Sequence, residues 1–249
     1  MTEVKRVEIL GVPVDLTDMP QALEIFKRLM KSEGCSLVVT PNSEIIVNAG
    51  KDIELKEIIK SADLVIPDGI GLVYASKILG YPMKERVTGI DFLYRVLGWL
   101  EESANSIYLL GSKPGENGEK GVAELAAMRM KESFPGLIVA GTHHGYFNRD
   151  EEEALIEEIN RSGADFLCVA MGAPKQEKFI SRYRNTLKVK AAIGVGGSLD
   201  VWAGSVKRAP EFYRRHGLEW LYRFIKQPAR YRRMAALPVF MIKVLFNRK

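Results

Sequence analysis

Three segments of this sequence place polar side chains directly after an apolar run or just before an amphipathic one, where they could perform chemistry. Thr40 and Asn42 follow the first such run and offer hydrogen bonds, while the carboxylate of Asp68 follows the second. A carboxylate there could act as a general base or bind a ribose hydroxyl, although helix capping would explain Asn42 or Asp68 equally well. Arg86 precedes an amphipathic stretch and could pair with a phosphate or a carboxylate.

Two later segments combine glycines with polar residues in the same kind of position. Gly172 is followed by Gln176 in the first turn of a predicted helix, where side-chain amides and unpaired N–H groups suit an anionic or sugar ligand. Three glycines within residues 194–197, Gly196 among them, would let a ligand approach the backbone closely. Asp200 comes about one turn later and could bind a ribose or a base edge. A tight turn alone would explain one or two of these glycines, but rarely three.

Several other kinds of chemistry lack their motifs. The three histidines, His143, His144 and His216, have no partners at ligand spacing, and no Asp-x-Asp pair ends a predicted strand. There is no P-loop, and the turn at residues 111–118 reads G-x-x-x-G-x-x-G rather than G-x-G-x-x-G. We therefore predict no metal and no nicotinamide cofactor, which disfavours a nucleotide-sugar epimerase or dehydrogenase.

These residues must be positioned by the regular elements around them. Short apolar runs predict strands at Val7–Leu10, Leu37–Thr40, Leu64–Ile66, Ser106–Leu110, Leu137–Ala140, Phe166–Ala170 and Ala191–Val195. Helical patterns occupy Ala22–Met30, Ile70–Leu79, Ile90–Leu100, Gly115–Glu132, Glu151–Asn160 and Pro174–Tyr183. Continuous apolar strands alternating with helices predict an α/β, Rossmann-like, mostly parallel sheet with helices on both faces. Right-handed crossovers then bring the carboxyl ends of the strands to one edge, where ligands bind.

The charge of the chain changes sharply near residue 206. Residues 207–249 contain twelve Lys and Arg but only two acids, whereas the residues before them contain 24 basic and 29 acidic side chains. We therefore predict an α/β catalytic domain at 1–204 and a basic, amphipathic, helical appendage at 205–249 that associates with an anionic membrane surface. No run reaches the roughly 20 apolar residues that a spanning helix needs. Two alternatives stay open, in which this tail binds single-stranded RNA or packs on the body.

The two cysteines, Cys35 and Cys168, lie beside apolar strand-like runs. We expect both to be buried, reduced thiols of a cytosolic protein. We expect no export signal, because no basic region followed by an apolar region opens the sequence.

Taken together, many short motifs occur in one order along nearly the whole chain. They are Thr40-Pro41-Asn42, Pro67-Asp68-Gly69, Arg86-x-x-Gly89-x-Asp91, Gly172-x-Pro174-x-Gln176-Glu177, Gly194-Val195-Gly196, Arg208-Ala209-Pro210, Gly217-Leu218-Glu219-Trp220, Arg223 and Pro228-x-Arg230-x-x-Arg233. In this set and order the chain resembles the bacterial TagA/WecG/CpsF family of glycosyltransferases.

The resemblance implies an inverting, metal-independent transfer of N-acetylmannosamine from UDP-ManNAc to a polyprenol-diphosphate-linked GlcNAc, in the synthesis of wall teichoic acid or a related surface polymer. It places the base at Asp68, a catalytic-pocket threonine at Thr40 and a diphosphate-side arginine at Arg86. It places donor binding at Gln176 and Asp200. The residues expected to contact substrate are Asn42, Tyr146, Gly172, Gln176, Gly196, Asp200, Arg223, Arg230 and Arg233, of which the three arginines would close over the site.

The resemblance also implies a cytoplasmic protein that lies peripherally on the inner face of the cell membrane and has no nucleic-acid partner. Another UDP-sugar donor on the same fold, or a basic-tailed nucleic-acid-binding protein, remains an alternative. The sequence leaves the oligomeric state open, including a homo-oligomer.

Overall fold

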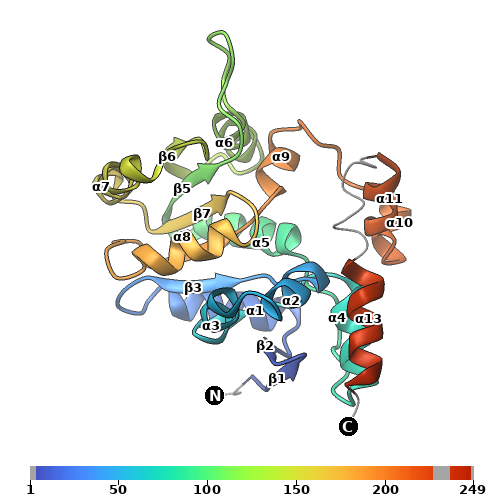
Figure 1. Ribbon diagram of the computed structural model, residues 1–249. Helices are drawn as coiled ribbons and strands as arrows, with labels where there is room; N and C mark the ends of the chain where they lie inside the picture. Colours follow the sequence, from blue (N-terminus) through green and yellow to red (C-terminus); the bar gives the residue numbers. More distant parts are fainter. Residues whose placement is uncertain (1–3, 227–235, 248–249) are drawn as a thin grey trace.

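The computed structural model describes residues 4–226 and 236–247. They form the α/β fold that the alternation of apolar runs and helical patterns predicted, built on one six-stranded sheet (Figure 1). The strands lie in the order β4-β3-β8-β7-β5-β6. Their bounds are β3 Ser36–Val39, β4 Leu64–Val65, β5 Ser106–Gly111, β6 Ile138–His143, β7 Phe166–Ala170 and β8 Ala191–Gly194.

All neighbouring strands of this sheet pair in parallel, so their carboxyl ends share one edge. Every residue of β3, β5, β7 and β8 is buried. A strand covered on both faces has no polar side to present, which explains why these segments read as continuous apolar runs.

The helices cover both faces of the sheet and create two apolar cores. Along β7, Leu167 belongs to one core and Cys168 to the other, because successive side chains of a strand point to opposite faces. Helices α3, α7 and α8 pack into the first core, and α1, α5 and α6 into the second. The helical bounds are α1 Met19–Leu29, α2 Ser43–Ala49, α3 Ile53–Lys60, α4 Ile70–Ile78, α5 Gly89–Ser103, α6 Val122–Ser133, η1 Arg149–Glu151, α7 Glu152–Ser162, α8 Lys175–Tyr183 and α9 Ser198–Trp202.

The first predicted strand does not join the parallel sheet. It runs as β1, Arg6–Ile9, and pairs antiparallel with β2, Val12–Asp15. Leu10 and Gly11 connect them with φ angles of 54° and 75°, the left-handed conformation at both central positions that a two-residue hairpin turn uses. The pattern did not predict this hairpin because Leu-Gly lacks the Asn or Asp that usually marks such a turn.

The predicted helix Gly115–Glu132 begins seven residues later than expected, at Val122. The intervening residues form a loop that extends away from the body in Figure 1. Asn117 and Gly118 adopt φ angles of 52° and 83°, which a helix cannot contain. Gly121 caps α6, and its N–H donates to the Glu124 carboxylate at 2.7 Å.

Both cysteines are buried and free, as predicted. Cys35 belongs to one core and Cys168 to the other. Burial raises the pKa of the Cys35 thiol to about 12 and also raises the pKa of the Cys168 thiol. Both therefore stay protonated at neutral pH, and a protonated thiol is a poor nucleophile.

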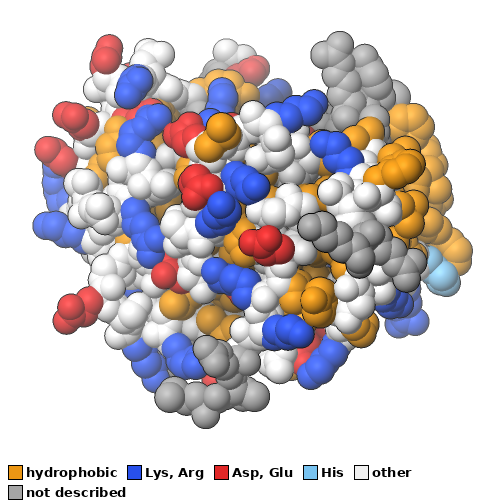
Figure 2. Space-filling model, turned by 60° about the horizontal axis from the view of Figure 1, so that its bottom comes forward, with side chains coloured by type: hydrophobic (Ala, Val, Ile, Leu, Met, Phe, Trp, Pro, Cys, Tyr) orange, Lys and Arg blue, Asp and Glu red, His pale blue; other side chains and the backbone are white. Residues whose placement is uncertain are grey.

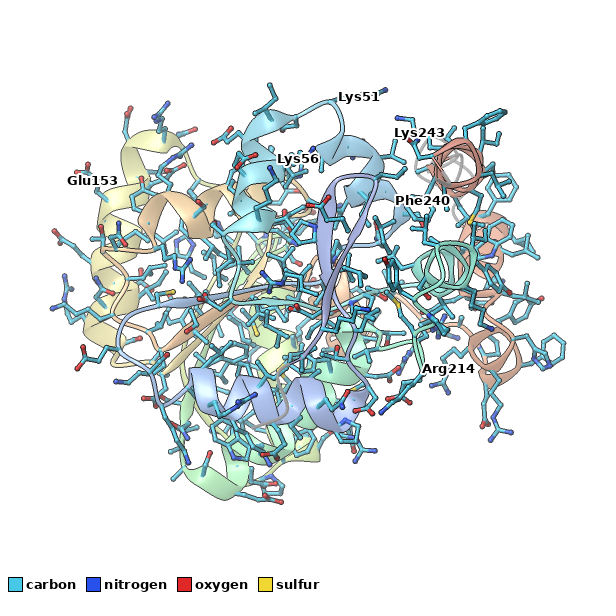
Figure 3. The ribbon with its side chains drawn as sticks, turned by 90° about the horizontal axis from the view of Figure 1, so that it is seen from below. Lys51, Lys56, Glu153, Arg214, Phe240 and Lys243 are labelled. Carbon is cyan, nitrogen blue, oxygen red and sulfur yellow. The ribbon has the colours of Figure 1, made fainter. Side chains whose placement is uncertain are left out.

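The C-terminal segment is helical, as expected, with α10 at Glu211–Arg215, α11 at Glu219–Lys226 and α13 at Ala236–Phe246. Helix α13 packs on α2 and α4, and Phe240 points from it toward the body (Figure 3). Phe240 and Val244 are fully buried in the same core as Leu37 of β3. Helix α13 therefore packs on the body, as one of the two alternatives for the tail proposed. The boundary between a catalytic domain and an appendage at residues 204–205 stays a prediction. None of the helices in the described residues is long and apolar enough to cross a membrane.

Candidate active site

A cavity of about 300 Å³ lies at the carboxyl ends of the four adjacent strands β4, β3, β8 and β7. This is the edge at which the sequence predicted a ligand site, and its walls are the loops that follow those strands together with residues from α4, α5, α11 and α13. Seven of the predicted site residues line it. They are Thr40, Asn42, Asp68, Arg86, Gly172, Gln176 and Gly196.

Thr40 and Asp68 face each other across Gly89. A methyl group placed on Gly89 would lie 3.3 Å from the Thr40 Oγ1 and 3.6 Å from the Asp68 Oδ2, so both oxygens point at the same small space. The Thr40 hydroxyl donates to the Gly194 carbonyl at 3.4 Å, and the Asp68 N–H donates to the Pro41 carbonyl at 2.9 Å. The first bond joins the ends of β3 and β8, and the second joins the ends of β3 and β4, so the backbones that carry both residues are held at the cavity.

Helix capping explains only one of Asn42 and Asp68, the two polar residues that the sequence allowed either to cap a helix or to bind a ligand. Asn42 is the cap of α2, and its side-chain oxygen accepts the Ile45 N–H at 3.0 Å. Asp68 is not the cap of α4, since Gly69 takes that position with a φ of 97°. A capping role therefore explains Asn42 but does not explain the carboxylate of Asp68.

Arg86 pairs with a carboxylate from the C-terminal segment. Its Nη2 lies 3.5 Å from the Glu219 Oε2 and donates to the Arg214 carbonyl at 3.3 Å. Both side chains of the Arg86–Glu219 pair are mostly buried, and both line the cavity. The guanidinium is thus fixed at the cavity by two contacts with residues more than 120 positions later in the chain.

A second ion pair joins the same two parts of the chain. The Asp91 Oδ2 accepts from the Thr88 hydroxyl at 2.6 Å and from the Arg208 Nη2 at 2.7 Å. Burial raises the pKa of the Asp91 carboxyl, but the hydrogen bonds from Arg208 and Thr88 outweigh it and leave that pKa below its ordinary value. Asp91 is therefore ionised at neutral pH and anchors Arg208 beside the site.

Gln176 lies between two of the loops that form the cavity wall. Its side-chain oxygen accepts the N–H groups of Gly172 and Gly196, at 3.2 Å and 3.0 Å. Both glycines have positive φ angles, 76° and 48°, in which other residues would be strained. Gln176 was predicted to bind the donor, and the structure shows that its amide oxygen already joins these loops.

Two predicted site residues lie outside the cavity lining in the described part of the chain. Asp200 is in α9, and its Oδ2 accepts from the Ser112 hydroxyl at 3.4 Å. Tyr146 follows β6, and 63% of its surface is exposed. The structure does not bring these two side chains to the cavity, so their substrate contacts stay predictions.

The three tail arginines of the prediction are not among the side chains that the structure describes. Arg223 belongs to α11, but its side chain is outside the described atoms, and Arg230 and Arg233 lie outside the described residues. Their closure over the site stays a prediction.

The cavity residues that the sequence reasoning missed as site residues include Glu219, Trp220 and Leu237 from the C-terminal segment. Glu219 and Trp220 belong to a motif that carried the resemblance, but nothing in their local pattern indicated that they reach the strand ends. Leu237 arrives on α13, where its Cδ1 would lie 2.7 Å from a methyl group on Gly71. Only the path of the chain brings them to the site.

Chemically, the cavity combines carboxylates, among them that of Asp68, with hydroxyls, a guanidinium and glycine-rich loops. Such a set can remove a proton from a hydroxyl and neutralise an anionic leaving group. In the described residues, no group of three or more His, Cys, Asp or Glu side chains gathers as potential metal ligands. The absence of a metal requirement stays a prediction.

Comparison with known proteins agrees with this chemistry. The sequence profile described as the Glycosyl transferase WecG/TagA/CpsF family matches residues 7–249. An N-acetylglucosaminyldiphosphoundecaprenol N-acetyl-beta-D-mannosaminyltransferase of Bacillus spizizenii is 38% identical over 210 residues, 84% of this chain and 79% of that protein. A protein of the same name from Staphylococcus aureus is 34% identical over 241 residues, 96% of this chain and 92% of its own length. The chain therefore belongs to the WecG/TagA/CpsF family of glycosyltransferases.

Proposed function

We propose that this protein transfers N-acetylmannosamine from UDP-ManNAc to undecaprenyl-diphosphate-linked GlcNAc, with inversion at the anomeric carbon and without a metal. The names of the relatives support this acceptor and this sugar. The observation that carries the proposal is that Asp68 and Thr40 both line the cavity, with the Asp68 carboxylate and the Thr40 hydroxyl close to the same glycine, Gly89. The product would enter wall teichoic acid or a related surface polymer.

In this reaction an acceptor hydroxyl attacks the anomeric carbon of the sugar. The new C–O bond forms as the bond to the UDP diphosphate breaks, and UDP leaves with that electron pair. Asp68 takes the proton of the attacking hydroxyl, and Thr40 beside it can hold that hydroxyl by a hydrogen bond. One base on one face of the sugar is what an inverting displacement requires.

The departing diphosphate needs positive charge. Arg86 lines the cavity, and Arg208, which Asp91 holds in an ion pair, lies close enough to Asp68 and Glu219 to interact with them electrostatically. Fixed guanidinium groups in a partly enclosed site stabilise a developing anion without further reorganisation. Arg223, Arg230 and Arg233 would add to this charge when the tail closes.

The acceptor is a lipid, and the surface near the cavity suits a membrane. Figure 2 shows hydrophobic side chains gathered along the side of the molecule that the C-terminal helices form. The exposed apolar residues of these helices are Phe212, Trp220, Phe224, Ile225, Val239, Ile242, Leu245 and Phe246. Together with the basic charge of the tail, they support a peripheral, cytoplasmic protein on the inner, anionic face of the membrane.

The test is a transfer assay with a short-chain prenyl-diphosphate-linked GlcNAc and a panel of UDP-sugars, following release of UDP. The proposal requires UDP-ManNAc to give the highest kcat/KM and a product of inverted configuration. Faster transfer from another UDP-sugar would show that the donor is not UDP-ManNAc, and it would leave the proposed acceptor unchanged. Binding to RNA but not to anionic liposomes at low salt would contradict the membrane partner.

A further inference from the structure

Gln176 and Glu177 lie in the first turn of α8 and are almost completely buried, and Gln176 lines the cavity. Their exposed fractions are 3% and 1%, although both side chains are polar. Such groups are costly to bury unless their hydrogen bonds are made inside the protein, so the contacts of this pair indicate what it does.

The amide of Gln176 has partners at both ends. Its Oε1 accepts from the Gly172 N–H after β7 and from the Gly196 N–H after β8, while its Nε2 donates to the Glu177 Oε1 at 2.8 Å. One side chain thus joins two loops that belong to neighbouring strands.

Gly194 shows how closely this amide is seated. A methyl group on Gly194 would lie 2.4 Å from the Gln176 Nε2, closer than a real Cβ approaches any atom. Glycine at this position therefore leaves the room that the amide needs to cross from one loop to the other. This gives a physical reason for the glycine at the start of the Gly194–Gly197 segment beyond close approach of a ligand.

Glu177 determines which way the amide faces. An amide has an acceptor end and a donor end, and only one orientation satisfies two backbone N–H groups. The Glu177 oxygen accepts from Nε2, which holds the donor end away from the glycines. If the amide were turned around, its NH₂ group would face the two glycine N–H groups. All three groups are donors, so no hydrogen bond could form between them.

We infer that Gln176 and Glu177 are a pair of positioning residues for the donor side of the cavity, in which Gln176 ties the two glycine loops together and Glu177 fixes the orientation of its amide. The Gly172 and Gly196 N–H groups are then structural, and a ligand is bound by other groups of these loops. The inference differs from a direct donor contact by Gln176, and its structural part does not depend on the proposed function.

Hydrogen exchange of individual backbone amides, followed by NMR, tests the tie between the loops without any substrate. The Gly172 and Gly196 N–H groups should be protected in the natural protein and should exchange about fivefold faster or more in Gln176→Leu, the effect of losing a hydrogen bond worth about 1 kcal/mol. The Val195 N–H, which donates to the Val169 carbonyl at 2.9 Å, is the internal reference and should not change.

Equal exchange rates in the natural protein and Gln176→Leu would overturn the inference. So would acceleration of Val195 by the same factor, because that indicates global destabilisation. If Gln176→Leu does not fold, Gln176→Asn replaces it, since an amide shorter by one carbon keeps the polarity but cannot reach both glycines.

Glu177 needs its own variants. Glu177→Met removes the acceptor and should accelerate exchange at Gly172 and Gly196, whereas Glu177→Gln keeps a carbonyl acceptor and should restore natural rates. The combination of Gln176→Leu with Glu177→Met should add nothing to Gln176→Leu alone, since both act through one amide. If the Gly172 and Gly196 N–H groups exchange in Glu177→Met as slowly as in the natural protein, Glu177 does not orient the amide of Gln176.

Kinetics add a second readout that rests on the proposed function. Gln176→Leu should raise the KM for the sugar-nucleotide donor more than it lowers kcat, and Glu177→Gln should stay near the natural values. Accelerated exchange in a protein that transfers no sugar from any donor would overturn the proposed function alone.

Discussion

The replacement Phe240→Ala tests whether the last described helix belongs to the working enzyme. Phe240 is fully buried and packs, with Val244, into the core that also contains Leu37 of β3. The same helix supplies Leu237 to the cavity wall. Loss of the Phe240 ring should therefore weaken both the fold and the site.

The expected magnitude follows from burial. Truncating a fully buried phenylalanine to alanine costs about 3–5 kcal/mol, from lost transfer free energy and the cavity left behind. For a protein of this size, about 2–4 °C of melting temperature is lost per kcal/mol, so the midpoint should fall by about 6–20 °C. Turnover should fall as well, because a displaced α13 no longer holds Leu237 beside Gly71.

Phe246→Ala is the matched control, since Phe246 lies on the same helix and 87% of its surface is exposed. A surface change of this kind usually stays within about 0.5 kcal/mol, so the melting temperature should hardly move. Thermal unfolding by circular dichroism and the UDP-release assay would be run on both variants. Equal melting temperatures and equal turnover for the two would refute the packing argument and leave α13 as a separate membrane appendage.

Three further predictions address the chemistry and the buried charge. Asp68→Asn should reduce turnover by about 10²–10⁴-fold, the usual effect of losing a general base, with donor affinity by calorimetry little changed; near-natural turnover would exclude Asp68 as the base. Activity should survive EDTA, and a loss that Mg²⁺ or Mn²⁺ restores would show that the arginines do not suffice for the leaving group. Burial raises the pKa of Glu177 in the folded protein, so its protonated form favours folding at low pH and this contribution is lost as pH rises through the folded pKa. The urea midpoint of the natural protein should therefore fall relative to that of Glu177→Gln as the pH increases from about 4, the ordinary pKa of Glu. The control Glu157→Gln, at an exposed position, should show no such trend. A difference in urea midpoint between the natural protein and Glu177→Gln that does not change with pH would contradict the burial argument.

Much of the fold was predictable because its signals are local. Apolar runs such as Phe166–Ala170 are continuous because both faces of the strand are covered, and that pattern is readable from a few residues. Parallel pairing then follows from the helices between the strands and gathers their carboxyl ends, which is why Thr40, Asp68 and Gly172 could be expected at one site. The hairpin at Leu10–Gly11 was missed because its turn depends on backbone angles that this dipeptide does not signal.

The sequence by itself therefore determined the parallel sheet, the edge at which the polar residues meet and the basic character of the C-terminal segment. Tertiary structure alone decided that Glu219 pairs with Arg86, that Phe240 is buried in the core and that the Gln176 amide joins two loops. The physical reason is range: strand and helix patterns depend on neighbours a few positions away, whereas the first two of these contacts join residues more than 100 positions apart. Gln176 lies four positions from Gly172 but 20 positions from Gly196, so its contact with both glycines depends on β7 and β8 lying side by side.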